Sequence, residues 1–593
     1  MRNAGLAVAA SAAVTLCLPG CGPRQVPADV VFTNGSIYTL AGDPPATVGA
    51  EPRVEALAVS AGRIVAVGTS AEIAKRVGPR TRVVDLHGRT AVPGLVDCHV
   101  HMQSLGRSLR EVDLVGTQSY DDVIARVRAR AADLPADEWV TGRGWDQNDW
   151  PEKQFPDHEA LSRAVPDHPV YLRRVDGHAA LANAAALRLG GVDAGTPDPS
   201  GGRIVRRPDG TPAGVLVDRA MDRVAARIPA PAPEERRLRL RLAADHALAA
   251  GLTGVHDAGI GVADLEDYTI LLREGALKLR VYAMVGATRA RPEDLESGAE
   301  THAAGAADVP EEAPNAILAY ALRDGPQPFD ASMHFCLRTV KLMVDGALGS
   351  RGASLLEPYS DAPGERGLPQ YSAAEFLALA RPLHARGFQL ATHAIGDAGN
   401  RMVLDAYETL QREAPRADAR HRIEHAQVLA PSDLPRFAAL GVVPSMQPTH
   451  CTSDMPWAGA RLGPERERGA YAWRGLRDTG VVIAAGSDAP VESVDPRLGL
   501  YAAVTRQDAA GWPAGGWHPD QVLSRSEALR AFTSWAAYSS FTDKDLGTLE
   551  PGKLADLTVF DRDVVSCAPH ELLESRGVMT VVGGDVVYEA SSR

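Results

Sequence analysis

The chain has 593 residues, 45% of them hydrophobic and 23% charged, and a formal net charge of −13 at pH 7. This composition supplies enough apolar residues for a barrel-sized core and a further domain, and it excludes a disordered or fibrous chain. Nucleic-acid binding depends on clustered Lys and Arg residues, and the sequence contains no long basic run. We therefore expect no nucleic-acid partner.

The first residues have the pattern of an export signal. Arg2 precedes an apolar stretch over residues 6–18, which is too short for a permanent membrane span. The residues up to Cys21 resemble the lipidation motif of bacterial lipoproteins, although a signal peptide that happens to contain Cys also fits. We expect residues 1–20 to be the signal peptide, 21–28 a linker, and Cys21 the lipidated residue. The protein would then be exported and anchored on the periplasmic or cell-surface side of a membrane, which it contacts through the lipid only.

Cysteine usage predicts no disulfide framework. The cysteines beyond the export signal are far apart and form no CxxC pair: Cys98, Cys336, Cys451 and Cys567. A domain of this size needs no disulfides, so we expect free, mostly buried thiols.

Short strands are predicted at both ends of the chain. Residues 29–40 alternate β-forming residues around Asn34-Gly35, which predicts a hairpin, and residues 55–67 predict a second strand pair around Ala61-Gly62. Residues 554–560 and 579–588 have the same character. Composition alone does not pair the strands of the two ends.

Between these ends, apolar runs that each finish in a polar residue alternate with Ala/Leu/Arg-rich helical stretches. This alternation predicts a parallel sheet with crossover helices. There are eight such runs: 95–101, 251–256, 279–285, 338–345, 388–393, 421–425, 442–447 and 481–488. Eight βα units predict a (β/α)₈ barrel, also called a TIM barrel, in which the active site lies at the carboxyl ends of the strands.

The gap between the first and second runs is too long for one crossover and predicts an insertion over about residues 110–235. Within it, residues 138–146 and 169–175 are strand-like, and 202–217 have a hairpin pattern. We expect the insertion to form a lid or wall over the barrel mouth.

Histidines and a carboxylate follow the ends of the apolar runs. His99 and His101 are two residues apart on a strand, so their side chains share one face and can bind one metal ion. His393, His425 and Asp488 end three later runs. The carboxyl ends of barrel strands meet at one mouth, so the sequence predicts a metal site there.

Several motifs along the chain resemble the amidohydrolase superfamily, in its third amidohydrolase family, which includes enzymes like N-substituted formamide deformylase. The resemblance covers about residues 29–590. It is carried by Ala91-Val-Pro-Gly-Leu-Val-Asp-Cys-His-Val-His101, Lys341-Leu-Met-Val-Asp-Gly-Ala-Leu-Gly-Ser350, His393-Ala-Ile-Gly-Asp397, Arg422-Ile-Glu-His-Ala-Gln427, Gln447-Pro-Thr-His450, Gly486-Ser-Asp-Ala-Pro490 and Gly547-Thr-Leu-Glu-Pro-Gly-Lys-Leu-Ala-Asp-Leu557.

The resemblance implies an overall architecture. A metal-dependent barrel over residues 93–545 lies beside a small β-sandwich, which is built from residues 29–92 and 546–593. This arrangement explains why strand patterns occur at both chain ends.

The resemblance also implies a set of metal ligands. His99 and His101 are similar to the pair on a first metal, and His393 and His425 to the pair on a second. Asp488 is similar to the carboxylate that touches the first metal and the attacking water.

Lys341 matches the position of a carboxylated lysine that bridges two metals in many superfamily members. A carbamate formed from CO₂ supplies two oxygen donors, whereas an ammonium group cannot bind a cation. The alternative is an unmodified lysine and a single metal. Histidine and carboxylate donors fit Zn²⁺ best and leave Mn²⁺, Co²⁺ and Fe²⁺ open.

The expected chemistry is hydrolysis of a C–N bond in a small-molecule amide, N-formyl or cyclic amide. A metal lowers the pKa of a bound water to about 7, and Asp488 would take the proton and pass it to the leaving nitrogen. Amine release needs such a proton donor.

Four further residues are predicted to bind substrate. His178 lies in an insertion segment that, by the resemblance, reaches the mouth, although a structural loop histidine is an equal alternative. Gln447 and His450 end the seventh run and could line the pocket. Trp145 could form an apolar wall, although tryptophan often only packs.

Two polar residues near the predicted site are interpreted as structural. His256 lies next to Asp257, which predicts a hydrogen-bonded pair. Glu424 adjoins His425 and should point to the opposite face, where it would support the site or the fold.

Other functions remain open at this point. A lactonase, a phosphotriesterase or a one-metal deaminase could use the same ligands, because a fold does not determine the bond that is cleaved. A surface-anchored scaffold without activity is disfavoured, because all six metal-ligand positions are intact. A homo-oligomer is compatible with the sequence.

Overall fold

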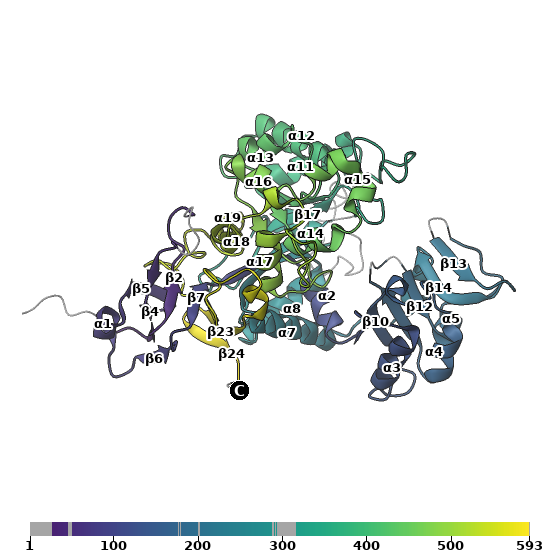
Figure 1. Ribbon diagram of the computed structural model, residues 1–593, viewed down its shortest axis with the longest axis horizontal. Coiled ribbons are helices and arrows are strands. Elements are labelled where there is room, and N and C mark those ends of the chain that lie inside the picture. Colours follow the sequence, from purple (N-terminus) through teal and green to yellow (C-terminus); the bar gives the residue numbers. More distant parts are fainter. Residues whose placement is uncertain are drawn as a thin grey trace, which may run out of the picture.

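The computed structural model describes residues 26–44, 50–175, 177, 179–199, 202–287, 290, 292 and 316–591. Figure 1 shows three parts side by side: a β-sandwich that joins the purple and yellow ends of the chain, a central barrel that carries most of the helices, and a separate lobe in blue. Among the described residues, no helix combines the length and the apolar character needed to cross a bilayer.

The central part is an eight-stranded parallel sheet that curves into a barrel. Its order is β21-β20-β19-β18-β17-β16-β15-β8. A parallel bridge between Val100 and Ala489 and a hydrogen bond of 2.7 Å from Asp488 N to His99 O bring the last strand against the first. The strands are β8 (Leu95–Val100), β15 (Leu252–Ile260), β16 (Arg280–Gly286), β17 (Phe335–Met343), β18 (Gln389–Ala394), β19 (Arg422–His425), β20 (Val443–Met446) and β21 (Ala484–Ala485).

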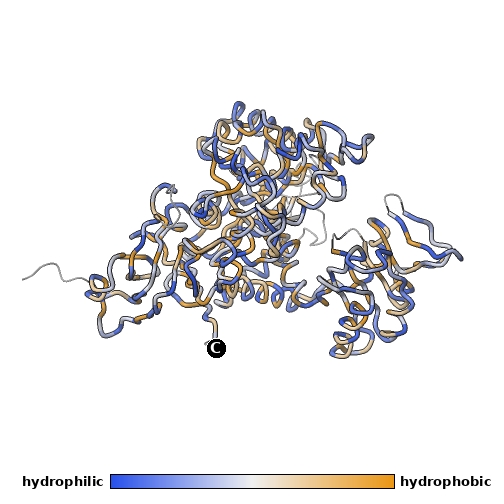
Figure 2. Tube along the Cα trace, viewed as in Figure 1, coloured by the Kyte–Doolittle hydropathy of each residue, from blue (hydrophilic) through white to orange (hydrophobic). Residues whose placement is uncertain are grey.

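Each of the eight predicted runs overlaps one of these strands, so the predicted barrel is confirmed. Most residues of these strands are apolar and buried, because helices cover the outer face of the sheet. Figure 2 shows hydrophobic and hydrophilic residues alternating along the outer helices, as expected for helices with one buried face.

Helices surround the barrel and follow its strands. In α11, for example, Ser372 caps the first turn, and Phe376, Leu379 and Leu383 recur at helical spacing on the buried face. The helices of this part are α2 (Met102–Ser108), α7 (Pro233–Ala249), α8 (Val262–Arg273), α10 (Ala316–Asp324), α11 (Ala373–Ala385), α12 (Asp397–Glu413), α13 (Leu434–Leu440), α14 (Pro448–Asp454), α15 (Ala458–Arg466), α16 (Trp473–Asp478), α17 (Pro496–Thr505), α18 (Arg525–Ala531), α19 (Ser534–Ser539) and α20 (Glu571–Glu574).

Two sheets form the β-sandwich. The first has the order β5-β4-β1-β6 and the second β24-β23-β22-β7-β2-β3, so the strands from the C-terminal end continue the second sheet beside those from the N-terminal end. Apolar residues of both ends, such as Phe32, Leu57 and Leu557, share one core. The elements are β1 (Val30–Thr33), β2 (Ser36–Tyr38), β3 (Arg53–Val54), β4 (Ala56–Ser60), β5 (Arg63–Gly68), α1 (Ser70–Ile73), β6 (Arg82–Asp85), β7 (Thr90–Pro93), β22 (Leu557–Phe560), β23 (Gly577–Val582) and β24 (Asp585–Glu589).

One predicted hairpin is wrong. The strands on the two sides of Asn34-Gly35 belong to different sheets, because β1 is already paired with β4 on one side and β6 on the other. Asn34 has a φ of 55°, and the chain there crosses from one sheet to the next. The hairpin predicted at Ala61-Gly62 is confirmed as the antiparallel pair β4–β5.

The insertion folds as a lobe with its own core. Its sheet has the order β13-β14-β12-β11-β10-β9 and contains the predicted strands and the predicted hairpin. In Figure 1 the lobe lies beside the barrel, and Arg143 Nη1 reaches the barrel mouth by donating to the Pro490 carbonyl at 2.6 Å. Its elements are β9 (Val112–Asp113), α3 (Tyr120–Ala131), β10 (Val140–Trp145), α4 (His158–Ala164), β11 (Val170–Arg174), β12 (Ala179–Ala182), α5 (Ala184–Leu189), β13 (Gly202–Arg206), β14 (Pro212–Asp218) and α6 (Asp222–Ala225).

The cysteines of the described chain agree with the sequence prediction. Cys98, Cys336, Cys451 and Cys567 are free, and the first three are buried.

Candidate metal centre

The carboxyl ends of five barrel strands bring the six predicted metal ligands together. His99 comes from β8 and His101 directly follows it, Lys341 comes from β17, His393 from β18, His425 from β19, and Asp488 from the loop after β21. One ligand atom each from His99, His425 and Asp488 lie within 4.8 Å of one another. The His393 and His425 ring centroids are 4.5 Å apart.

Asp488 faces both histidines of the first strand. Its Oδ1 lies 3.2 Å from His101 Nε2 and 3.6 Å from His99 Nε2. This oxygen is buried and makes no hydrogen bond among the described residues. Burial opposes ionisation, but the neighbouring His99 and His101 hold the pKa of Asp488 well below its ordinary value.

His99 is oriented by a buried carboxylate. Its Nδ1 lies 2.6 Å from Glu424 Oε2, so the Nδ1–H donates to Glu424 and Nε2 is the nitrogen that could bind a metal. Burial first, and then the charge of Lys341, lower the pKa of His99 to about 4. The imidazole is therefore neutral near pH 7, as a metal ligand must be.

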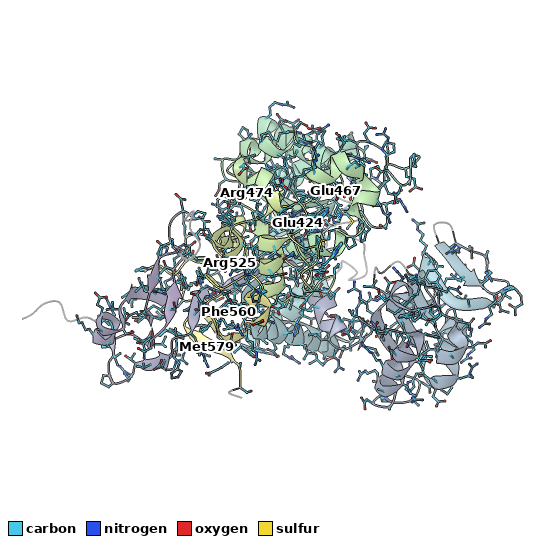
Figure 3. All side chains as sticks on the ribbon, in the orientation of Figure 1. Glu424, Glu467, Arg474, Arg525, Phe560 and Met579 are labelled. Carbon is cyan, nitrogen blue, oxygen red and sulfur yellow. The ribbon has the colours of Figure 1, made fainter. Side chains whose placement is uncertain are left out.

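Glu424 is held in turn by a fully buried arginine. Arg422 Nε donates to Glu424 Oε1 at 2.7 Å, and the same guanidinium donates to Ser445 Oγ at 2.8 Å and to the carbonyl of Cys98 at 2.7 Å. Figure 3 labels Glu424 within the barrel. Both Arg422 and Glu424 have no exposed surface.

These contacts correct two predictions. Glu424 does not point away from the site: it faces the barrel interior, and a φ of 74° at His425 turns the backbone so that both neighbours reach the centre. His256 does not pair with Asp257; its Nδ1 accepts a hydrogen bond of 2.8 Å from Arg422. Asp257 instead accepts from the Tyr268 hydroxyl at 2.7 Å.

The His425 ring is oriented as well. His425 Nδ1 lies 2.8 Å from Gln447 Oε1, which leaves Nε2 for a metal. His393 Nε2 lies 3.5 Å from Asp345 Oδ1 and, among the described residues, is buried without a hydrogen bond. Gln447, which we predicted to bind substrate, is buried and instead orients a histidine.

Lys341 is buried next to these ligands. It is 2% exposed, and its Nζ lies 3.3 Å from His99 Nε2. Burial lowers the pKa of Lys341 to about 8, so a substantial part of the amine is neutral near physiological pH.

Asp97 and Ser487 join the first and last strands, a role that the sequence analysis missed. Asp97 Oδ1 accepts from the backbone N–H groups of His99 and Ser487, both at 3.0 Å, and Oδ2 accepts from Ser487 Oγ at 2.5 Å. The signal was available, because Asp97 is two residues before His99 and two residues on a strand share a face.

The predicted substrate-binding residues have different outcomes. His450 Nε2 lies 3.7 Å from Asp488 Oδ2, and the His450 ring is stacked on His425 at 5.8 Å, so His450 belongs to the centre. Trp145 does not line the site: it is 1% exposed in the core of the lobe, and its Nε1 donates to the Leu172 carbonyl. His178 and Cys21 lie outside the described residues.

This donor set fits a divalent cation. Neutral imidazole nitrogens and a carboxylate oxygen converge without hydrogen bonds between them, so their lone pairs face a common space. Nitrogen and oxygen donors of this kind suit Zn²⁺ and its first-row neighbours. His101, with a side chain 37% exposed, leaves one side of the centre open for substrate.

Comparisons with known proteins also support a metal site. Residues 82–588 match the amidohydrolase family. The chain is 30% identical to N-substituted formamide deformylase of Arthrobacter pascens over 90% of this chain and 95% of that protein, and 33% identical to the protein LONG AFTER FAR-RED 3 of Arabidopsis thaliana over 95% and 92%. A crystal structure of a metal-dependent hydrolase from Pyrococcus horikoshii superimposes with a TM-score of 0.71 at 28% identity and covers 91% of this chain and 99% of that one.

Proposed function

This chain belongs to the amidohydrolase family, and from that premise we propose that it hydrolyses the C–N bond of a small-molecule amide, N-formyl or cyclic amide. The observation that carries the proposal is the position of Asp488 Oδ1, which is buried, without a hydrogen bond, and within 3.6 Å of two imidazole nitrogens. The similarity to a formamide deformylase over nearly the whole chain supports the type of bond.

We propose that His99, His101 and Asp488 hold a first divalent ion, most suitably Zn²⁺, and that His393 and His425 hold a second. Such ions supply Lewis acidity, which polarises a carbonyl group and lowers the pKa of water. Glu424 and Gln447 fix the ring orientations of His99 and His425 that this arrangement requires.

In this proposal Asp488 moves the proton. Its low pKa keeps the carboxylate ionised near pH 7, so Oδ1 can accept a proton from the attacking water. The same oxygen then delivers the proton to the nitrogen of the leaving amine. His450, whose Nε2 is buried without a hydrogen bond, lies beside Asp488 Oδ2 and is the residue that we place against the substrate.

Lys341 would connect the two ions as a carbamate. The neutral amine attacks the carbon of CO₂ and loses a proton, which leaves one negative charge shared by two oxygens. A pKa of about 8 favours this reaction because part of the amine is neutral near physiological pH. Burial favours it because the carbamate is shielded from water.

We also propose that the protein acts outside the cytoplasm. The support is the sequence alone: an apolar export signal that ends at a cysteine suited to lipidation.

The test is metal analysis together with activity on the mature chain, produced from residue 22 and purified without chelators. We expect about two ions per chain, a native mass increased by one CO₂, and release of amine from N-formyl or N-acetyl amines. About one ion without the added mass would replace the binuclear site by a mononuclear one. A metal-loaded protein that cleaves lactones or phosphotriesters, and no amide, would overturn the proposal.

A further inference from the structure

A large cavity separates the lobe from the barrel. It has a volume of about 1580 Å³ and is lined by residues of α2, α7, β10 and β11. Helix α2 begins directly after the metal ligand His101. Arg107, in the last turn of this helix, lines the cavity.

Arginines on the cavity wall outnumber the carboxylates that they contact. Arg173 Nη2 donates to Glu111 Oε2 at 3.0 Å, and Arg107 Nε lies 3.5 Å from Glu111 Oε1. Arg107 Nε is buried and has no hydrogen-bond partner among the described residues. Asp137, Glu138 and Asp222 also line the cavity, but in the described part of the chain none of them forms an ion pair with Arg107 or Arg173.

A third arginine connects this pair to the metal centre. Arg143 on β10 donates to the carbonyls of Pro490 at 2.6 Å and Val175 at 3.2 Å, and within the described residues it has no carboxylate partner. Pro490 is two residues beyond Asp488. The charge of Arg143 is repelled by Arg173 and attracted by Glu111, Asp488 and Glu492, so it is close to the metal centre as well as to the arginine pair.

The three guanidinium groups repel one another. Burial first, and then the charge of Arg173, lower the pKa values of both Arg107 and Arg143. Glu111 is the one carboxylate in contact with this group among the described residues. A second anion between the arginines and the metal centre would relieve the repulsion and give Arg107 Nε the hydrogen-bond partner that it lacks among the described residues.

We infer that Arg143, with Arg107 and Arg173, binds a negatively charged group of the substrate, so that the hydrolysed molecule is an amide carrying a carboxylate. The inference rests on the proposed function and specifies its substrate class. A planar carboxylate matches the paired N–H donors of a guanidinium, which a lysine would not offer. The net charge of the whole protein is −13, so a local group of positive charges also attracts anions to this part of an otherwise acidic protein.

A purely structural interpretation is that Arg143 only ties the lobe to the barrel through two carbonyls. Loss of such a tie would reduce activity on every substrate alike. Loss of an anion-binding group reduces activity on charged substrates selectively. The ratio of kcat/KM for a charged substrate to kcat/KM for its neutral analogue therefore distinguishes the structural role from the anion-binding role.

The experiment compares N-formyl-phenylalanine with N-formyl-phenethylamine, and the corresponding N-acetyl pair, on the metal-loaded mature enzyme. We expect kcat/KM to favour the acid by about tenfold or more, and the Arg143→Ala and Arg173→Ala variants to lose about tenfold of that preference. Arg143→Lys should recover part of it. Arg203→Ala, which removes one positive charge from the exposed strand β13 of the same lobe, should keep the full preference.

Equal kcat/KM values for acid and neutral amide in the wild type, or an unchanged ratio in Arg143→Ala, would overturn the inference and leave the proposed function standing. A second measurement does not depend on turnover. Calorimetric titration of N-acetyl-phenylalanine into the Asp488→Asn variant should show binding that weakens with salt and weakens at least tenfold when Arg143→Ala is added. No binding of the acid to Asp488→Asn would also overturn it, whatever bond the enzyme cleaves.

Discussion

Oε2 of Glu424 lies 2.6 Å from Nδ1 of His99, and this contact determines which nitrogen of His99 faces the metal centre. The same arrangement recurs at His425, whose Nδ1 lies 2.8 Å from Gln447 Oε1. These two histidines therefore each depend on a residue that is not one of the proposed metal ligands. Glu424 differs from Gln447 because it is charged, and Arg422, itself fully buried, neutralises that charge.

The first prediction concerns Glu424. Glu424→Gln should weaken metal affinity by about 10- to 100-fold, because the glutamine side chain no longer offers a charged acceptor to the Nδ1–H of His99. Competition with a coloured chelator measures this affinity directly. Glu527→Gln is the control, since Glu527 also pairs with arginines, at 2.5 Å to Arg474, but on the distant helix α18. The control should lose stability and keep metal affinity; wild-type affinity in Glu424→Gln would exclude the orienting role.

The second prediction concerns the proton carrier. Asp488→Asn should lower kcat by about 10²- to 10⁴-fold while the circular dichroism spectrum stays that of the wild type. The amide cannot accept the proton of water, although it can still occupy the space of the carboxylate. Glu492→Gln, which changes a carboxylate four residues away that accepts from Ser453 Oγ, should retain activity. Near-normal turnover in Asp488→Asn would assign the proton transfer to another group.

The third prediction is a dependence on pH and CO₂ that acts through Lys341. Its pKa is lowered from the ordinary value of 10.5 to about 8, so the reactive neutral amine increases as the pH rises toward 8 and is scarce below 7. Reactivation of the metal-free enzyme by Zn²⁺ and bicarbonate should therefore be faster at pH 8.5 than at pH 6.5, by roughly tenfold per pH unit below the pKa.

Variants of the same lysine supply the control. Lys341→Ala should lose metal and recover part of its activity when a short carboxylic acid such as propionate replaces the missing oxygens. Lys341→Arg cannot form a carbamate and should show no bicarbonate dependence. Unchanged metal content in Lys341→Ala would exclude the bridging carbamate.

The barrel and the convergence of its ligands could be predicted from the sequence, because both depend on local patterns. Apolar runs with polar ends repeat along the chain, and spacing by two on a strand places His99 and His101 on one face. Predictions that required partners distant in sequence did less well. Asn34-Gly35 has the composition of a hairpin, but β4 and β6 occupy both edges of β1. Trp145 has the size of a pocket wall, but it fills the core of the lobe.

Glu424 shows the same limit at the site itself. Strand alternation places it opposite His425, and the alternation fails because His425 and Ala426 have φ values of 74° and 42°. A positive φ at a residue other than glycine is uncommon and depends on tertiary contacts, so no local pattern in the sequence indicates it. Here the closed barrel supplies those contacts, and the irregular backbone lets two successive side chains serve one centre.

The last prediction tests whether closure of the barrel supports the metal site. A Cβ added at Gly486 would lie 2.5 Å from His99 N and 2.7 Å from Asp97 Oδ1, so Gly486→Ala must push the last strand away from the first. We expect a loss of about 1–3 kcal/mol in the free energy of unfolding, and metal loss at chelator concentrations that the wild type resists. Gly364→Ala is the matched control, because nothing lies within 4 Å of its added Cβ. Thermal unfolding with and without Zn²⁺ measures both effects. If Gly486→Ala binds metal normally while its unfolding temperature falls, the Asp97–Ser487 closure stabilises the fold without positioning His99 and Asp488.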